Sequence, residues 1–151
     1  MKLLATCFTL IVLVTSCNSK KKLLSKSIEN SSEQLHTTMI YNAFTRGFFQ
    51  EILITKNNVT EFKDYEKLNP INSELDSVNW ENCLRLLDQI NLENLANLKS
   101  PTNRRQFDGA AFAKLTIIRN EDTIQSNSFD HKQPPSELKP LVEYILSIKG
   151  K

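Results

Sequence analysis

Apolar and β-branched side chains are concentrated in three short segments that follow one another closely. The segments are residues 36–44, 48–55 and 59–63. Their enrichment in aromatic and β-branched residues, without a helical stripe, is typical of strands. Thr45-Arg46-Gly47 and Lys56-Asn57-Asn58 stand between the segments and have the composition of turns, so we predict a three-stranded antiparallel meander.

A polar segment, residues 64–76, reads as a loop and precedes a stretch with helical periodicity. Five side chains recur there at three- and four-residue spacing: Trp80, Cys83, Leu84, Leu87 and Ile90. This spacing predicts an amphipathic helix that lies on the sheet and is capped by Ser77 or Asn79. Three leucines continue the spacing and predict a further helical turn: Leu92, Leu95 and Leu98.

The C-terminal third has the same order of strands followed by a helix. Residues 110–119 and 123–129 have strand composition and flank a hairpin turn. With Asn120-Glu121 or Glu121-Asp122 as the turn, antiparallel register pairs Asp130 with Ala111 or Ala113, respectively. A last helix carries six apolar side chains on one face: Leu138, Leu141, Val142, Ile145, Leu146 and Ile148.

This order of elements predicts an α+β two-layer sandwich. We expect an antiparallel sheet of about five strands, in the order βββαββα, with two helices packed on one face. The 117 residues from Leu35 onward suffice for one modest core and are few for two, so residues 35–151 are expected to form a single domain.

The first seventeen residues have the pattern of a secretion signal. Lys2 provides a positive start, residues 3–14 form an apolar region broken only by threonines, and Thr15-Ser16 places small residues before Cys17. With the polar run that follows, the pattern resembles the lipobox of bacterial lipoproteins. In these proteins the cysteine receives a diacylglycerol, the signal is cut before it, and the new amine is acylated, often with palmitate. We therefore expect residues 1–16 to be a signal peptide and Cys17 to be the lipidated residue.

Two alternatives to the lipoprotein are open. The chain could be a soluble secreted protein that is cut nearby. An uncleaved anchor is disfavoured, because the uncharged run ends by Lys20 and is shorter than the roughly 20 apolar residues of a membrane span.

Residues 17–34 are polar and rich in serine and lysine, so we expect a flexible tether between lipid and domain. In the enterobacterial sorting rule an aspartate after the lipidated cysteine retains a protein in the inner membrane. Asn18 occupies that position here, which favours the outer membrane. Lysines rather than acidic residues in the tether favour the side that faces the periplasm.

Several short motifs within residues 39–148 carry a family resemblance. They are Arg46-Gly47-Phe48-Phe49-Gln50, Ser100-Pro101, Phe107-Asp108-Gly109-Ala110, Ser128-Phe129-Asp130-His131 and Pro134-Pro135. Together with the lipobox, this pattern resembles small uncharacterised lipoproteins of Bacteroidetes-type bacteria. The resemblance implies a lipid anchor and a single domain, and it implies no catalytic residue.

Charge and motifs exclude several classes of function. From Leu35 onward the chain has 14 basic and 15 acidic residues, without the basic excess of a nucleic-acid-binding domain. His36 and His131 are the two histidines, and no His/Cys spacing typical of a metal site is present, so we expect no metal and no cofactor.

Cys83 lies on the apolar stripe of a predicted helix, where it would pack rather than react. Glycine-rich and G-x-S-x-G motifs are absent, so no catalytic residue is assigned.

The most distinctive polar residues are expected at one end of the second hairpin. They are Arg104, Arg105, Asp108, Asp130 and His131. They form our candidate binding surface. The alternative is structural, because aspartates accept backbone hydrogen bonds in turns and arginines can balance their charge.

We expect a non-enzymatic domain, held on the membrane by its acyl chains in the bacterial cell envelope, that binds a protein, peptide or glycan partner. One alternative is a hydrolase-like envelope enzyme of another type that uses Asp108, Asp130 and His131. A second alternative is an inhibitor or immunity protein for an envelope enzyme.

Overall fold

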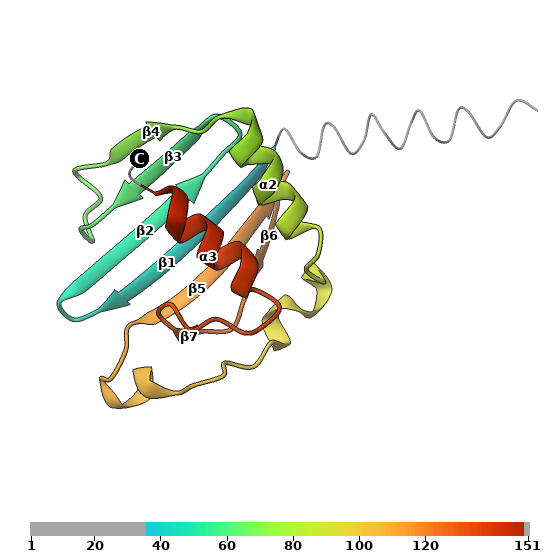
Figure 1. Ribbon diagram of the computed structural model, residues 1–151. Helices are drawn as coiled ribbons and strands as arrows, with labels where there is room; N and C mark the ends of the chain where they lie inside the picture. The colour runs from blue at the N-terminus through green and yellow to red at the C-terminus, as the bar shows by residue number, and fades with distance from the viewer. Residues whose placement is uncertain (1–35, 150–151) are drawn as a thin grey trace, which may run out of the picture. The chain divides into compact units, whose positions relative to one another are not determined.

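The computed structural model describes residues 36–149 (Figure 1). The predicted signal peptide, Cys17 and the tether lie outside these residues. The elements in chain order are β1 (Thr37–Thr45), β2 (Phe48–Ile54), β3 (Asn58–Phe62), β4 (Ile71–Glu74), α2 (Ser77–Leu87), η1 (Leu92–Asn97), η2 (Arg104–Phe107), β5 (Phe112–Arg119), β6 (Asp122–Gln125), β7 (Phe129–Asp130) and α3 (Lys139–Ile148). Here η denotes a 3-10 helix.

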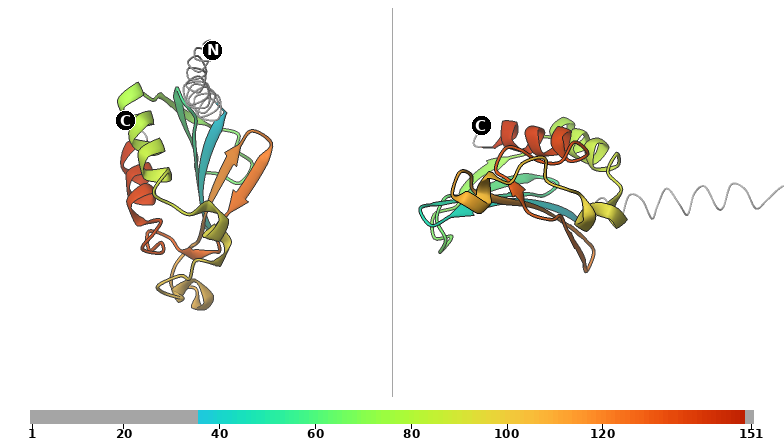
Figure 2. Two further views of the ribbon diagram at one scale, coloured as in Figure 1. Left: turned by 90° about the vertical axis from the view of Figure 1, so that its right-hand side faces the viewer. Right: turned by 90° about the horizontal axis from the view of Figure 1, so that it is seen from below.

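The fold is α+β, as predicted. The strands form one antiparallel sheet in the order β4-β3-β2-β1-β5-β6, and β7 pairs with β5 beyond the end of β6. Both α2 and α3 lie on one face of this sheet, and no helix covers the other face within the described residues (Figure 2). The meander, η1 and the turn at Arg46-Gly47 are where the pattern placed them.

The predicted count of about five strands is wrong, because the described chain forms seven. One additional strand, β4, lies inside the segment that we expected to be a polar loop. It is an edge strand without a buried residue, so its side chains do not alternate in polarity and give no strand signal. The other difference is that the predicted strand 123–129 is split into β6 and β7.

The split arises from one extra residue in the outer strand. Asn120-Glu121 forms the turn, with Arg119 paired to Asp122, and the unbroken register would pair Asp130 with Ala111. In the structure Asp130 pairs with Phe112 instead, so the predicted register is wrong by one residue. Asn127 and Ser128 together oppose the single residue Lys114, which is a β-bulge.

The bulge is explained by the burial of Phe129. In the unbroken register Phe129 would lie opposite Phe112 and point away from the helices. In the observed register it lies opposite Ala113 on the helix-covered face and is fully buried. Burial of a whole aromatic side chain stabilises by about 2 to 3 kcal/mol, which favours the shifted register.

One core joins the sheet to the two helices. Alternate residues of β1 and β5 enter it, and Trp80 and Cys83 of α2 are buried in it as predicted. The cap of α2 differs from the prediction, since Asp76 Oδ1 accepts a hydrogen bond of 2.7 Å from the Asn79 N–H. Pro140 lies in the first turn of α3, as predicted. Backbone N–H groups of a first turn have no partner within the helix, so a proline there costs no helical hydrogen bond.

No helix among residues 36–149 combines the length and the apolar character needed to span a bilayer.

Candidate functional site

The candidate residues gather at one end of the sheet, which we call the distal end. It contains the β1–β2 turn at Arg46-Gly47, the start of β5 and the end of β7. The described chain enters β1 at Thr37, which is paired with Arg119 at the opposite end. About seven residues of β1, or roughly 23 Å, separate the two ends.

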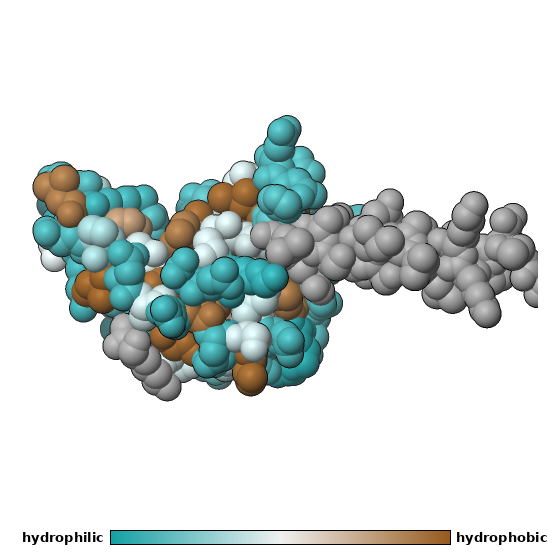
Figure 3. Space-filling view, turned by 90° about the horizontal axis from the view of Figure 1, so that it is seen from above, coloured by the Kyte–Doolittle hydropathy of each residue, from teal (hydrophilic) through white to brown (hydrophobic). Residues whose placement is uncertain are grey.

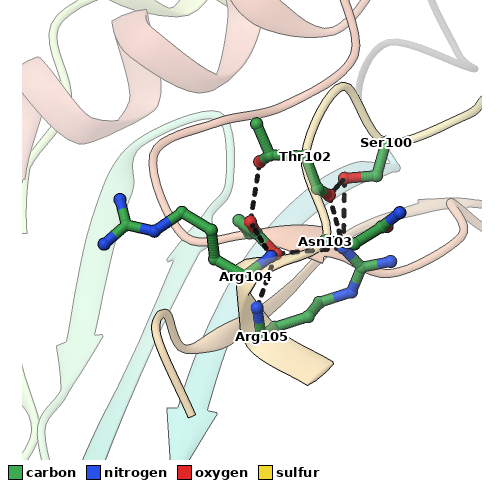
Figure 4. Close-up of polar contacts among 6 residues, drawn as sticks. Ser100, Thr102, Asn103, Arg104 and Arg105 are labelled. Atoms are coloured by element: carbon green, nitrogen blue, oxygen red, sulfur yellow. Dashed lines mark hydrogen bonds and ion pairs between the residues drawn. The ribbon is translucent and has the colours of Figure 1, made fainter. Parts of the chain in front are cut away.

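A buried carboxylate organises this end. Asp130 is fully buried at the end of β7. Its Oδ2 accepts hydrogen bonds from Thr102 Oγ1 at 2.6 Å and from the Arg104 N–H at 2.7 Å (Figure 4). Its Oδ1 accepts from the Arg105 N–H at 3.1 Å and from Arg105 Nη1 at 3.0 Å. Four donors thus hold the first turn of η2 onto the end of the sheet.

The guanidinium of Arg105 ties the same loop to itself. Besides Asp130, its Nη1 donates to Ser100 Oγ at 3.1 Å, to the Thr102 carbonyl at 2.8 Å and to Asn103 Oδ1 at 3.3 Å. The Arg105 side chain is 9% exposed, so both members of the ion pair are withdrawn from solvent. The loop from Ser100 to Arg105 is therefore held by interactions that water screens weakly.

These interactions determine the ionisation of Asp130. Burial alone would raise the pKa of its carboxyl, but the hydrogen bonds from Thr102, Arg105 and Arg104 outweigh burial and lower the pKa to about 2. Asp130 therefore stays ionised at neutral pH with both oxygens occupied. A carboxylate in this state is poorly suited to accept or release a proton during a reaction.

Beyond this network, η2 projects an exposed tip, formed by Arg104, Phe107 and Asp108. The helix ends at Asp108, which has a left-handed φ of 55°, and the Gly109 N–H returns to the Arg104 carbonyl at 2.9 Å. A Cβ at Gly109 would lie 3.2 Å from that carbonyl oxygen, which explains a glycine at this position. Phe107 is 83% exposed and contributes almost nothing to the core.

His131 lies on the helix-covered side of the distal end. Its Nδ1 is 2.8 Å from the hydroxyl of the buried Tyr41, and its ring packs against Phe48 with centroids 5.3 Å apart. Burial, with the nearby charges of Lys132 and Lys149, lowers the pKa of His131 to about 4, so the ring is neutral at pH 7. Burial likewise raises the pKa of Tyr41 to about 12. The neutral pair is consistent with the Tyr41 hydroxyl donating to Nδ1.

The structure brings the five predicted site residues to the same end but gives them different environments. Arg104 and Asp108 are exposed, His131 is half-buried, and Arg105 and Asp130 are buried. The last two support the loop and are not available as a binding surface. For these two residues the arrangement matches the structural alternative, in which the aspartate accepts backbone hydrogen bonds and the arginine balances its charge.

Sequence reasoning missed several residues that shape this end of the sheet. They are Ser100, Thr102, Tyr41, Phe48 and Phe107. The serine and threonine hydroxyls near Pro101 were a usable signal, because such side chains commonly hydrogen-bond in turns. An isolated phenylalanine between polar residues was a second signal.

Among residues 36–149, no three His, Cys, Asp or Glu side chains are placed to hold a metal ion together. The Cys83 thiol is buried in the core, and burial raises its pKa to about 11. It is therefore a thiol rather than a thiolate at neutral pH, which makes it a poor nucleophile.

Comparison with known proteins does not assign the chain to a family. No protein-family model matches it, and no curated protein sequence matches it. The function is therefore inferred from the residues themselves.

Proposed function

We propose that this chain is a lipid-anchored cell-envelope protein whose domain, residues 35–151, binds a protein, peptide or glycan partner through its distal end. The observation that supports this most is the η2 tip, where exposed residues sit on a loop held by a buried network. An exposed aromatic next to an arginine is the composition found at the centres of protein interfaces.

The rigidity of the tip favours binding over a passive connection. A partner that meets a preorganised loop does not have to order it, so less binding free energy is lost. Asp130 supplies this order from beneath, through hydrogen bonds to two consecutive backbone N–H groups of η2.

Backbone strain occurs in the loops at this end of the sheet, as it does at Lys67 and Asn120 in two other turns. Asp108 at the tip and Lys132 after β7 both have left-handed backbones, with φ of 55° and 64°. Residues other than glycine rarely adopt this conformation, and it persists where surrounding contacts enforce it, often at functional sites. Here the enforcing contacts are the Gly109 N–H to Arg104 and the Gln133 N–H to Asp130.

The placement of the tip suits an anchored protein. The chain reaches the domain at the start of β1, and the tip lies at the opposite end of the sheet. With acyl chains on Cys17 and a tether of residues 17–34, the distal end can point away from the membrane. We infer an outer-membrane location facing the periplasm from Asn18 and from the lysines of the tether.

The enzyme alternative is less well supported. A hydrolase that used Asp108, Asp130 and His131 would lose one of its two carboxylates as a proton carrier, because both oxygens of Asp130 are occupied. An inhibitor or immunity protein is compatible with the same tip. Its partner would be an envelope enzyme, and identification of the bound protein distinguishes the two cases.

The anchor is tested by metabolic labelling with palmitate. We expect the parent chain to incorporate label and to be shortened by the signal peptide. The Cys17→Ser variant should remain an unprocessed precursor without label. Palmitate on the Cys17→Ser variant would overturn the lipoprotein proposal.

The binding surface is tested by capture from envelope extracts with matched variants. Phe107→Ala and Arg104→Ala remove exposed side chains of the tip. Val78→Ala removes a 66% exposed side chain on α2, away from the tip, and serves as the control. We expect a protein or glycan that is retained by the parent and the control and lost from the tip variants. Equal capture by all four proteins would contradict binding through the tip.

A further inference from the structure

The sheet face opposite the helices is concave. α2 and α3 lie on one side of the sheet, and the β3–β4 loop (residues 63–70) and the β5–β6 hairpin both project from the other side (Figure 2). The view from above shows a hollow between these two projections, with brown, apolar residues in it (Figure 3). We call this side of the sheet the open face and the hollow the trough. The trough is a surface separate from the tip of η2.

The β3–β4 loop folds over the β2 side of the open face and forms one wall of the trough. The ring of Tyr65 packs on Phe49 with centroids 4.8 Å apart, and the Tyr65 hydroxyl donates a hydrogen bond to the Thr45 carbonyl. Lys67 Nζ forms an ion pair of 2.5 Å with Glu51 Oε1. The part of the open face that is left for a ligand is therefore the floor formed by β1 and β5.

Aromatic rings form the distal end of this floor. Phe44 of β1 is the register partner of Phe112 on β5. Their rings stack with centroids 6.0 Å apart at an interplanar angle of 22°, and the two residues are 38% and 37% exposed. Tyr65 is 52% exposed on the adjoining wall. Contiguous exposure of large apolar side chains is typical of an interaction surface, so these three rings form a platform for a ligand.

A polar row crosses the floor next to the platform, two residues along β1. Asn42 is the register partner of Lys114 on β5, and its Nδ2 donates to Glu51 Oε2 at 3.3 Å. Lys114 Nζ donates to Gln125 Oε1 at 3.2 Å, and Gln125 Nε2 donates to Thr116 Oγ1 at 3.0 Å. These bonds hold amide, ammonium and hydroxyl groups in position, which lowers the entropy lost when a ligand binds to them.

The polar row carries an unbalanced positive charge. Two ammonium groups, those of Lys67 and Lys114, stand against the one carboxylate of Glu51, which is already paired with Lys67. Among the ion pairs of residues 36–149, none includes Lys114. A ligand that brings an acidic group to Lys114 therefore supplies the counter-charge.

The chemistry of the floor matches a sugar. One face of a pyranose ring is covered by C–H groups and packs on an aromatic ring, whereas the hydroxyl groups at its edge both donate and accept hydrogen bonds. Phe44 and Phe112 offer the aromatic surface, and Asn42 and Gln125 offer amide groups at its side. A uronic acid is a sugar that also carries a carboxylate, for which Lys114 is the partner.

A peptide fits this floor less well. β1 is paired with β2 and β5, and β5 is paired with β1 on one side and with β6 and β7 on the other. The floor therefore presents side chains rather than a free strand edge. A peptide that lay on it would bury N–H and C=O groups without backbone partners, which is unfavourable. An oligosaccharide has no peptide backbone to satisfy.

From these observations we propose that the trough of the open face binds an acidic glycan, namely an oligosaccharide that contains uronic acid residues. A sugar ring stacks on Phe44 and Phe112, its carboxylate pairs with Lys114, and its hydroxyl groups bond to Asn42 and Gln125. The proposal concerns a surface other than the η2 tip and does not depend on the partner of that tip.

Calorimetric titration with defined oligosaccharides tests the ligand class. The core lies within residues 36–149, so the chain from Asn18 onward can be used in solution. The probes are short oligomers of galacturonic, glucuronic or mannuronic acid, each compared with the same oligomer after reduction of its carboxyl groups to alcohols. We expect saturable binding of at least one acidic oligomer, with a dissociation constant about tenfold higher for its reduced form. Absence of binding by all the acidic oligomers, or equal binding of both forms, would overturn the proposal.

Lys114→Gln tests the position of the carboxylate. This variant should raise the dissociation constant of the acidic oligomer about tenfold and leave that of the reduced oligomer unchanged, because only the acidic form carries the charge. Lys56→Gln is the matched control, since Lys56 is exposed in the β2–β3 turn at the opposite end of the sheet. Equal effects of the two variants would show that the acidic group does not lie at Lys114.

Phe44→Ala tests the aromatic platform. It should weaken the binding of both forms of the oligomer about tenfold, because the stacked surface is common to both. Phe107→Ala at the η2 tip should bind like the parent. Binding that is lost in Phe107→Ala and kept in Phe44→Ala would place the glycan on the tip, which overturns the trough and leaves the function proposed for the tip standing. If Phe44→Ala is not folded by circular dichroism, the result for Lys114→Gln decides.

Discussion

Asp130 and Arg105 form an ion pair of 3.0 Å in which the carboxylate side chain is fully buried and the arginine side chain is 9% exposed. The two residues are 25 positions apart in the chain, one at the end of β7 and the other in η2. A buried pair of this kind contributes little net stability compared with apolar packing, but loss of one partner leaves an isolated buried charge. The pair therefore makes the loop sensitive to changes at either residue.

Asp130→Asn should destabilise the domain by about 3 to 5 kcal/mol, because the guanidinium of Arg105 would be buried without a counter-charge. Unfolding in urea, monitored by circular dichroism, measures the change. Asp108→Asn is the matched control, since Asp108 is exposed and the same substitution there should change stability by less than about 0.5 kcal/mol. Equal effects of the two variants would show that the buried network does not support the loop.

Acid should destabilise the domain in two steps. The pKa of His131 is about 4 in the folded chain against an ordinary 6.5, so the unfolded chain binds a proton at higher pH. Stability should therefore fall by at most about 3 kcal/mol as the pH drops from about 6.5 to about 4. The pKa of Asp130 is lowered from 3.8 to about 2, so the domain should lose about 2 kcal/mol more of stability as the pH falls from about 3.8 to about 2.

Urea unfolding at a series of pH values checks both steps. His131→Phe does not titrate, so this variant should lose the first step and keep the second. A parent whose stability is unchanged between pH 7 and pH 5 would contradict the placement of His131 beside Tyr41 and Phe48.

Trp80→Ala should lower the free energy of unfolding by about 3 to 5 kcal/mol, the usual effect of deleting a large buried aromatic. Trp80 is 4% exposed and faces the sheet from α2. Val78→Ala on the same helix should have almost no effect. An unchanged melting temperature for Trp80→Ala would mean that α2 presents its other face to the sheet.

Cys83 should react with a maleimide only as the domain unfolds, because the thiol is buried and its pKa is raised to about 11. In the chain from Asn18 onward, labelling is followed by mass spectrometry across a urea series. We expect labelling to follow the unfolding transition. Rapid labelling in the absence of urea would indicate an accessible thiol, and Cys83 would again be a candidate nucleophile.

Elements with one buried face were predictable from the sequence. β1, β2, β5, α2 and α3 each carry apolar residues at the period of their own geometry, and they occur where that period predicts them. β4 was not predictable because an edge strand with no buried residue has no such period. Hairpin geometry also predicted the meeting of Asp130 with the start of β5, to within one residue.

The role of each site residue was less predictable than its location. The partners of Asp130 are 25 to 28 positions away, and Tyr41 is 90 positions from His131. Local pattern contains no information on contacts of that separation. It could indicate that Asp130, Arg105 and His131 share one end of the sheet, but not that two of them would be buried.

The bulge at Asn127 and Ser128 makes the number of residues in this strand as constrained as their identity. Before the bulge, even-numbered residues such as Ile124 lie on the helix-covered face of the sheet. After the bulge, odd-numbered residues such as Phe129 lie on that face. Deleting one of these residues would restore an uninterrupted ladder and at the same time turn Phe129 out of the core and move Asp130 off the η2 loop. Substitutions at Asn127, which is exposed, should be tolerated, whereas a change of length by a single codon should abolish both core closure and the tip.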